Sequence, residues 1–213
     1  MIKADLHVHT IYSGDSRSQL EQIIARCNEV GINCIAVTDH NTIAGAVEMR
    51  KTAPFKVIVG EEIHTSNGEV IGYFLTQEIP KGLTATETMR RIKEQGGLVA
   101  VPHPFDRLRG SAIQRSALEA ILPDVDIIEV LNARSILQRY NTMAGQLAQK
   151  HGLAASAGSD AHTLGEIGAA YIKMPDFNGK DDFLKALKQG KIMGQVSPRI
   201  VHLKSTLAKI RRG

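Results

Sequence analysis

Short runs rich in apolar and β-branched residues alternate along the chain with segments whose apolar residues recur at helical spacing. Strands are predicted at residues 2–9, 33–38, 56–60, 69–75, 98–102, 126–131, 153–157 and 169–173. Helices are predicted at 18–30, 43–52, 84–95, 112–122, 135–150 and 181–190. This alternation favours an α/β fold with a mostly parallel sheet wrapped by helices, either open or closed into a barrel.

Local signals sharpen two parts of this pattern. The strands at 56–60 and 69–75 have no helix between them, and Ser66-Asn67-Gly68 is typical of a hairpin turn. Thr84 followed by Glu87 predicts a cap for the helix that Gly96-Gly97 should end. In the first helix, Leu20, Ile23, Ile24 and Cys27 form an apolar stripe.

Histidines and carboxylates gather where the predicted strands end. Asp5, His7 and His9 alternate along the first strand and should share a face, so Asp5 could orient one of the two imidazoles. Asp39-His40 follows the second strand, Glu61-Glu62 the third, His103 the fifth, and Asp160 with His162 the seventh. Because ligands collect at the C-terminal ends of such strands, these residues predict a metal site there.

Other hydrolytic and nucleotide-binding chemistries lack their motifs. The chain has no G-x-S-x-G nucleophile elbow, no G-x-G-x-x-G loop and no Walker pattern. Cys27 and Cys34 are expected to be small buried thiols in a reducing compartment. Metal ions are therefore expected to carry the chemistry.

The motifs DLHVHT, TDHN, GEEIHT, HPF and GSDAH, in that order over about residues 1–170, resemble the polymerase and histidinol phosphatase (PHP) family. The resemblance implies a distorted (βα)7 barrel, phosphoesterase activity, and two or three divalent ions (Zn, Mn, Fe or Mg) at the strand ends. It implies a first ion held by His7, His9, Glu62 and Asp160, a second by Glu62 and His103, and a third by Asp15, His40 and His162. Glu69 stands where many members have a histidine, and as a metal ligand it would favour Mn²⁺ or Mg²⁺ over Zn²⁺.

Three further side chains are candidates for binding substrate. His64 would share a face with Glu62 on an extended segment; the alternative is an ordinary loop histidine. Arg134 follows the sixth strand and could hold a phosphate through two parallel hydrogen bonds, the alternative being a surface salt bridge. Arg17 is a weaker candidate of the same type.

The function expected is hydrolysis of a phosphorylated metabolite or nucleotide by a metal-bound hydroxide at a di- or trinuclear site. The expected catalytic residues are His7, His9, Glu62, His103, Asp160 and His162. Two alternatives are a nuclease acting on short oligonucleotides and a non-catalytic PHP binding module. No obligate protein partner is indicated.

Charge and hydropathy complete the picture. The 213-residue chain should form a PHP domain over residues 1–195 and a basic C-terminal extension over residues 196–213. Residues 180–213 hold nine Lys and Arg against two Asp, which could attract phosphorylated or nucleic-acid substrates. The N-terminus has no signal-peptide layout, and no apolar run approaches the roughly 20 residues of a membrane span. A cytoplasmic protein with no membrane partner is therefore expected.

Overall fold

The strands form one sheet in the computed structural model, which describes residues 1–196. They are β1 (Ile2–Val8), β2 (Cys34–Val37), β3 (Lys56–Thr65), β4 (Gly68–Tyr73), β5 (Leu98–Val101), β6 (Ile127–Asn132), β7 (Ala154–Gly158), β8 (Ala170–Met174) and β9 (Lys191–Gly194). Their order in the sheet is β7-β6-β5-β4-β3-β2-β1-β8-β9. The predicted extension at 196–213 lies, apart from Val196, outside the described residues.

The sheet is nearly closed into a barrel, because the end of β7 returns to the end of β1. The backbone N–H of Asp160 donates to the carbonyl of His7 at 2.7 Å, and that of His9 donates to Ala161 at 3.0 Å. Gly158 makes this approach possible, since a Cβ there would collide with the side chain of His7. The predicted barrel is therefore confirmed.

The distortion of the barrel lies in its strand directions. Neighbours β1, β2 and β3 are parallel, as are β5, β6 and β7, but β4 runs antiparallel to both β3 and β5. The predicted hairpin at Ser66-Asn67-Gly68 joins β3 to β4. β8 lies antiparallel against β1, and β9, which the hydrophobic pattern did not predict, pairs with β8.

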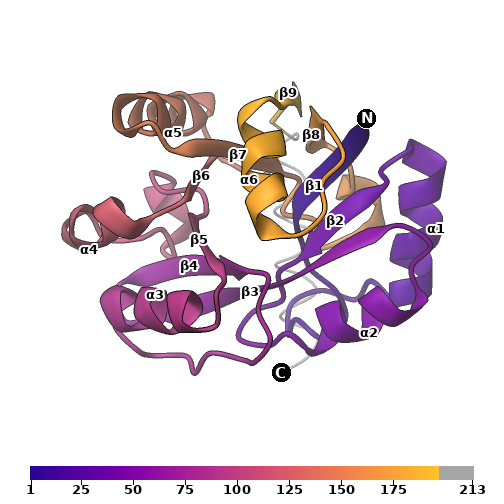
Figure 1. Cartoon of the computed structure of the whole chain (residues 1–213), viewed down its shortest axis with the longest axis horizontal. Helices are drawn as coiled ribbons and strands as arrows, with labels where there is room; N and C mark the ends of the chain where they lie inside the picture. Colours follow the sequence, from indigo (N-terminus) through magenta and orange to yellow (C-terminus); the bar gives the residue numbers. More distant parts are fainter. Residues whose placement is uncertain (197–213) are drawn as a thin grey trace.

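Helices surround this sheet (Figure 1). They are α1 (Leu20–Val30), α2 (Ala44–Thr52), α3 (Ala85–Glu94), α4 (Arg115–Ile121), α5 (Gln138–His151) and α6 (Lys180–Lys188). Short 3₁₀ turns occur at η1 (Arg107–Arg109), η2 (Leu122–Asp124) and η3 (Leu164–Glu166). The hydroxyl of Thr84 accepts from the N–H of Glu87 at 3.2 Å, which confirms the predicted cap of α3. None of the helices described is long and apolar enough to cross a membrane.

Two apolar clusters hold the helices and the barrel together. One lies between the sheet and its outer helices and includes the buried stripe Leu20, Ile23 and Cys27 of α1. The other contains Ala4, Ala36 and Ala100 from three strands, together with Phe183 of α6. Cys27 and Cys34 are buried free thiols, as predicted, and burial raises the pKa of each to about 12.

One difference from the predicted strands affects the site directly. The third strand was expected to end at Gly60, but β3 continues to Thr65. Glu62 therefore lies within β3 rather than after it, and His64 pairs across the hairpin with Glu69 of β4. Residues directly opposite on two antiparallel strands have neighbouring side chains, so the longer strand brings Glu69 toward the other candidate ligands.

Candidate metal centre

The first group of candidate ligands joins β1 to β3 and to the end of β7. The ring atoms Nε2 of His7 and His9 each lie 3.3 Å from Oε2 of Glu62. Oδ1 of Asp160 lies 3.8 Å from Nε2 of His7 and 3.4 Å from Nε2 of His9. All four residues are at most 1% exposed. The structure thus brings together the four residues predicted to hold a first ion.

A second group shares Glu62 and faces the β3–β4 hairpin. Its members are Glu62, Glu69 and His103, whose ligand atoms lie within 4.8 Å of one another. Nε2 of His103 is 3.2 Å from Oε1 of Glu62 and 3.6 Å from Oε2 of Glu69. Glu62 can therefore bridge two positions, since Oε2 faces one group and Oε1 the other. Glu69, which stands where many PHP proteins have a histidine, belongs to this second group.

A third group lies nearer the surface. His9, Asp15, His40 and His162 also have ligand atoms within 4.8 Å of one another. Oδ2 of Asp15 is 3.1 Å from Nε2 of His162 and 3.4 Å from Nε2 of His40. A hollow of about 360 Å³, lined by Gly14, Asp15, His40 and Asn41, opens beside this group.

His64 occupies a position between these groups. With His40 and Glu69 it forms a fourth set of candidate ligands, and its Nε2 lies 2.8 Å from Oε1 of Glu69. The side chain is 46% exposed, whereas that of Glu69 is 4% exposed. His64 thus lines the candidate site from its solvent side.

Buried ring nitrogens without hydrogen-bond partners make these groups suitable for binding metal ions. Nε2 of His7 and of His9 are buried and have no hydrogen-bond partner of proper geometry among the described residues. Buried polar atoms are rarely left in this state. A divalent ion bonded at roughly 2.0–2.2 Å to nitrogen and to oxygen fits between atoms that lie 3.3–3.8 Å apart.

The electrostatics of the first group also favour cations. Burial disfavours the charged form of His9, but the carboxylates of Asp160 and Glu62 outweigh it and raise the pKa of His9 to about 10. Burial raises the pKa of Glu62, yet the surrounding histidines hold it well below its usual range. The same competition, with Arg109 as the largest favourable partner, keeps the pKa of Asp160 low. Positive charge therefore stabilises this pocket of buried carboxylates.

Glu129 orients His7, a role that the sequence suggested for Asp5. Oε1 of Glu129 lies 3.0 Å from Nδ1 of His7, and its Oε2 accepts from the N–H of His103 at 2.9 Å. Asp5 instead accepts from the backbone N–H groups of Ser159, Gly168 and His7. The prediction for Asp5 was wrong, because its carboxylate fixes the backbone where β7 meets β1. The missed signal was Glu129, a carboxylate flanked on both sides by apolar residues in the strand predicted at 126–131.

Glu61 and Glu62 point to different surroundings, as neighbours on a strand must. Oε2 of Glu61 accepts from the N–H of Ile79 at 2.9 Å, away from the histidines. His103 and Asp160 both have positive φ, at 28° and 55°, a conformation that non-glycine residues adopt rarely. Such strain is often found at functional sites.

Arg109 is the arginine that meets the candidate ligands. Its guanidinium pairs with Oδ2 of Asp160 and donates to Oδ1 of Asn132 at 3.2 Å. Sequence reasoning missed it, although it lies six residues after His103 in the same loop.

Of the two predicted arginines, Arg134 is occupied by a carboxylate outside the ligand groups. Arg134 pairs at 2.8 Å with Glu166, whose other oxygen accepts from the N–H of His162 at 3.1 Å. The salt bridge of Arg134 is therefore buried and supports the turn that carries His162. Arg17 is exposed in the loop between β1 and α1.

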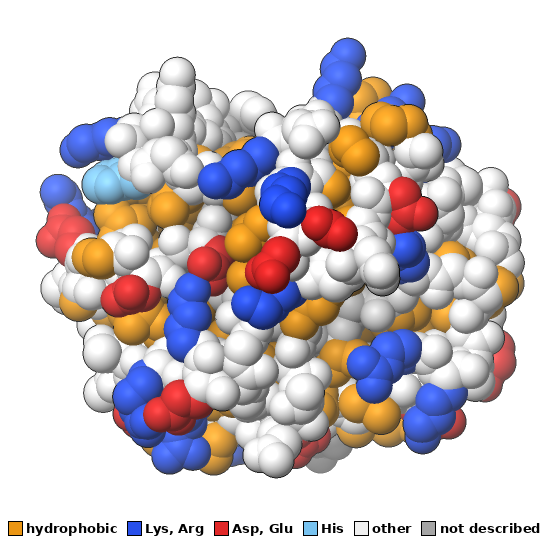
Figure 2. Space-filling model, viewed as in Figure 1, with side chains coloured by type: hydrophobic (Ala, Val, Ile, Leu, Met, Phe, Trp, Pro, Cys, Tyr) orange, Lys and Arg blue, Asp and Glu red, His pale blue; other side chains and the backbone are white. Residues whose placement is uncertain are grey.

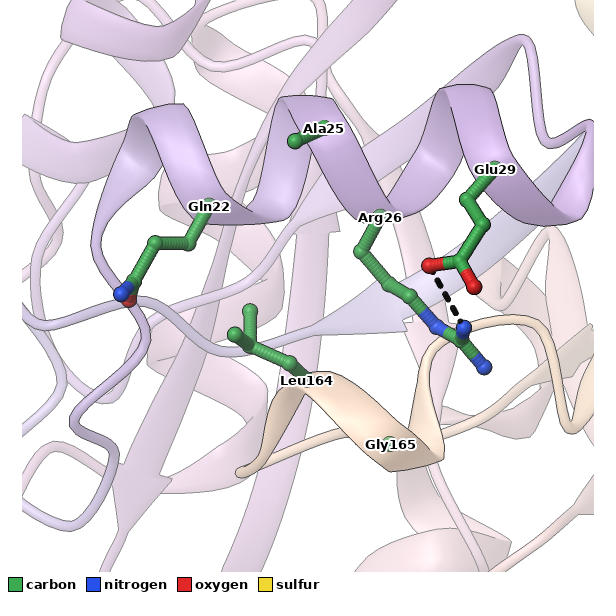
Figure 3. Close-up of a pocket in the computed structure, with 6 residues that line it drawn as sticks. All are labelled: Gln22, Ala25, Arg26, Glu29, Leu164 and Gly165. Atoms are coloured by element: carbon green, nitrogen blue, oxygen red, sulfur yellow. Dashed lines mark ion pairs between the residues drawn. The ribbon is translucent and has the colours of Figure 1, made fainter.

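A separate hollow of about 470 Å³ lies between α1 and η3 (Figure 3). It is lined by Gln22, Ala25, Arg26, Glu29, Leu164 and Gly165. Arg26 pairs with Glu29 at 2.8 Å, and none of the six residues belongs to the candidate ligand groups. The hollow is not part of the metal centre.

Comparisons with known proteins agree with this fold. The family model described as PHP-associated matches residues 138–192. The fold resembles a two-domain protein of Bacteroides vulgatus that contains a predicted PHP-like metal-dependent phosphoesterase, with a TM-score of 0.71 and 18% identity, over 98% of this chain and 69% of that chain. The chain belongs to the PHP family.

Two further similarities describe this PHP protein's relatives. An uncharacterized protein of Methanocaldococcus jannaschii is 37% identical over 215 residues, covering 98% of this chain and 86% of the relative. A candidate metal-dependent phosphoesterase of Bifidobacterium adolescentis shares the fold with a TM-score of 0.66 and 17% identity, over 88% of this chain and 96% of that chain.

Proposed function

We propose that this PHP protein hydrolyses a small phosphorylated metabolite or nucleotide with two or three divalent cations, in the cytoplasm. The observation that carries the proposal is the position of Glu62. Its Oε2 faces the rings of His7, His9 and His40, while its Oε1 faces His103. A carboxylate shared in this way is suited to hold two cations close together, as in the two-metal sites that clamp the attacking and leaving oxygens of a phosphoester.

Bound cations would activate a water molecule and neutralise the oxygens of the phosphate. His7, His9, Glu62 and Asp160 would hold the first, Glu62, Glu69 and His103 the second, and Asp15, His40 and His162 the third. The mixed nitrogen and oxygen ligands suit Zn, Mn or Fe, and the carboxylate of Glu69 adds a preference for harder ions such as Mn²⁺ or Mg²⁺.

The protein's own side chains would bind and orient the ester. Arg109 is held beside the site by Asp160 and Asn132, so its planar guanidinium is placed to hydrogen-bond phosphate oxygens. The pKa of His64 is raised, chiefly by its hydrogen bond to Glu69, which favours a proton on the ring. From the solvent side of the site, a protonated His64 would be placed to protonate the leaving alkoxide.

Metal content and hydrolysis test the proposal together. Purified protein should contain two or three equivalents of divalent metal and should hydrolyse p-nitrophenyl phosphate or its bis-ester with added Mn²⁺, Zn²⁺ or Mg²⁺. His103→Ala should lose one equivalent and nearly all turnover. His151→Ala, on the exposed end of α5, is the matched control and should retain both.

Two outcomes would contradict the proposal. One is a protein that binds its full metal complement but hydrolyses neither ester nor a panel of phosphorylated metabolites, which would indicate a binding module. The other is full turnover by metal-replete His103→Ala, which would remove the second position from the site.

A further inference from the structure

A groove separate from the ligand groups runs between α4 and α5. It has a volume of about 840 Å³, and its walls include the loop that follows His103. Its floor is made by Phe105, Ile113, Leu118, Leu122, Met143 and Leu147. Figure 2 shows hydrophobic atoms exposed in the hollow between these two helices, with Lys and Arg side chains around them.

The rim of the groove is cationic. Arg107, Arg115, Arg139 and Lys150 line it against a single carboxylate, Glu119. Glu119 pairs with Arg115 at 2.9 Å, but no other acidic residue lines the groove. Met143 is 43% exposed and lies beside the partly buried Leu147, so apolar surface is open to solvent in the groove.

We propose that this groove binds an acidic amphipathic helix of a partner protein. Leu118 and Leu122 of the α4 side, and Met143 and Leu147 of α5, are each four residues apart, which makes parallel apolar ridges with a furrow between them. A helix with apolar residues at i, i+3, i+4 and i+7 fits such a furrow. Glutamates and aspartates beside that apolar face would meet the arginines and the lysine of the rim.

The length of the groove agrees with a helical occupant. Its lining residues on α5 extend from Arg139 to His151. At 1.5 Å per residue this is about 18 Å, the length of a helix of roughly 12 residues. Three turns would place three or four apolar side chains on the floor.

Charge argues against a second copy of this chain docked through the same groove. A two-fold contact would place one cationic rim against another. Single-stranded nucleic acid matches the charge but not the floor, because successive bases stack on aromatic rings and this floor is mainly aliphatic. Besides Phe105, the lining includes the ring of Tyr140. The guanidinium of Arg139 already lies over that ring, 5.3 Å from its centre.

Binding of a defined peptide to the full chain tests the proposal. The probe is a fluorescein-labelled, stapled helical peptide of about 14 residues, with leucine at the i, i+3, i+4 and i+7 positions and glutamate on the flanking faces. A matched peptide carries lysine in place of glutamate. By fluorescence anisotropy, the acidic peptide should bind saturably and at least about tenfold more tightly than the basic one, because the rim carries net positive charge.

Variants of exposed lining residues locate the binding. Met143→Glu should weaken the acidic peptide at least about tenfold, because it puts a carboxylate on the apolar floor. Arg139→Glu should reduce or invert the preference between the two peptides. Lys51→Glu, an exposed charge reversal on α2, should change neither. Metal content should be the same in all three, so a failure here is distinct from a failure of the metal site.

Three results would overturn the proposal. They are no saturable binding of the acidic peptide, equal binding of both peptides, and acidic-peptide binding that survives Met143→Glu. A thymidine oligonucleotide provides the last comparison. If it binds more tightly than the acidic peptide and loses its affinity in Arg139→Glu, the groove is a nucleic-acid site instead.

Discussion

The two ends of the barrel interior are both buried, but their side chains are opposite in chemistry. At one end, Ala4 and Ala36 fill the space between strands and Phe183 of α6 closes it. At the other, His7 and Glu62 are 0% and 1% exposed. Burial alone therefore does not distinguish core from site. The distinction is that the described side chains packed around Phe183 are apolar or, like Tyr73, hydrogen-bonded, whereas the second end leaves ring nitrogens without partners.

The two ends should also differ in what they contribute to the molecule. Burying Phe183 stabilises the fold, because apolar surface leaves water. Burying histidines against carboxylates costs free energy unless the charges are fully compensated, and cations between them would complete that compensation. Variants at the two ends should therefore separate stability from metal binding.

The largest effect is expected at the polar end. His7→Ala should lower the proposed phosphoesterase activity at least about 10⁴-fold, a loss of more than 5 kcal/mol of transition-state stabilisation, because the first cation loses a ligand. Metal analysis of the same preparation should show fewer bound equivalents. The metal-free variant should be no more stable than the metal-free wild type, because Glu129 loses its partner and the missing ring leaves a cavity. Full turnover with the full complement of metal would show that His7 is not a metal ligand.

The next effect belongs to the apolar end. Phe183→Ala should lower the free energy of unfolding by about 3–5 kcal/mol, measured by urea denaturation, because Phe183 is completely buried and packs on Tyr73, Phe74 and Phe177. The folded fraction should still bind its full complement of metal. Lys185→Ala, on the exposed face of α6, is the control and should change the unfolding free energy by no more than about 0.5 kcal/mol. If both variants lost the same unfolding free energy, burial of Phe183 would not be what closes this end of the barrel.

The difference between the ends also explains what the sequence could and could not predict. Apolar periodicity predicted every strand from β1 to β8, because each has one face against this interior. The groups around His7 and Glu62 were predicted from the motifs that resemble PHP proteins, and the convergence of the strand ends explains why those motifs meet. Arg109 was missed because its contact with Asp160 depends on how a 3₁₀ turn folds back, which residue spacing does not encode. Strand β9 was missed because its short KIMG run has no burial pattern of its own.

An intermediate effect is expected for Glu129, which supports the polar end from an otherwise apolar strand. Glu129→Gln should weaken metal binding by roughly 10–100-fold, because the amide is a poorer acceptor for Nδ1 of His7. The measurement is the metal dissociation constant from competition with a chromogenic chelator. Glu48→Gln, exposed on α2, provides the matched control. An unchanged dissociation constant in Glu129→Gln would mean that the hydrogen bond does not orient the ring.

The smallest effect is expected where the two ends meet. The hydroxyl of Tyr73 donates to the carbonyl of Leu6 at 2.8 Å, between Asp5 and His7 on β1, while its ring packs on Phe183. Burial holds the pKa of Tyr73 well above its ordinary value, so the phenol keeps its proton and remains a donor over any working pH. Tyr73→Phe should cost about 0.5–1.5 kcal/mol of unfolding free energy, because one buried hydrogen bond is lost and the packing is kept. Since that bond fixes the backbone next to His7 and not its ring, metal affinity should stay within about threefold of the wild type. A much larger loss of metal would show that the apolar end positions the ligands, and that the two ends cannot be varied independently.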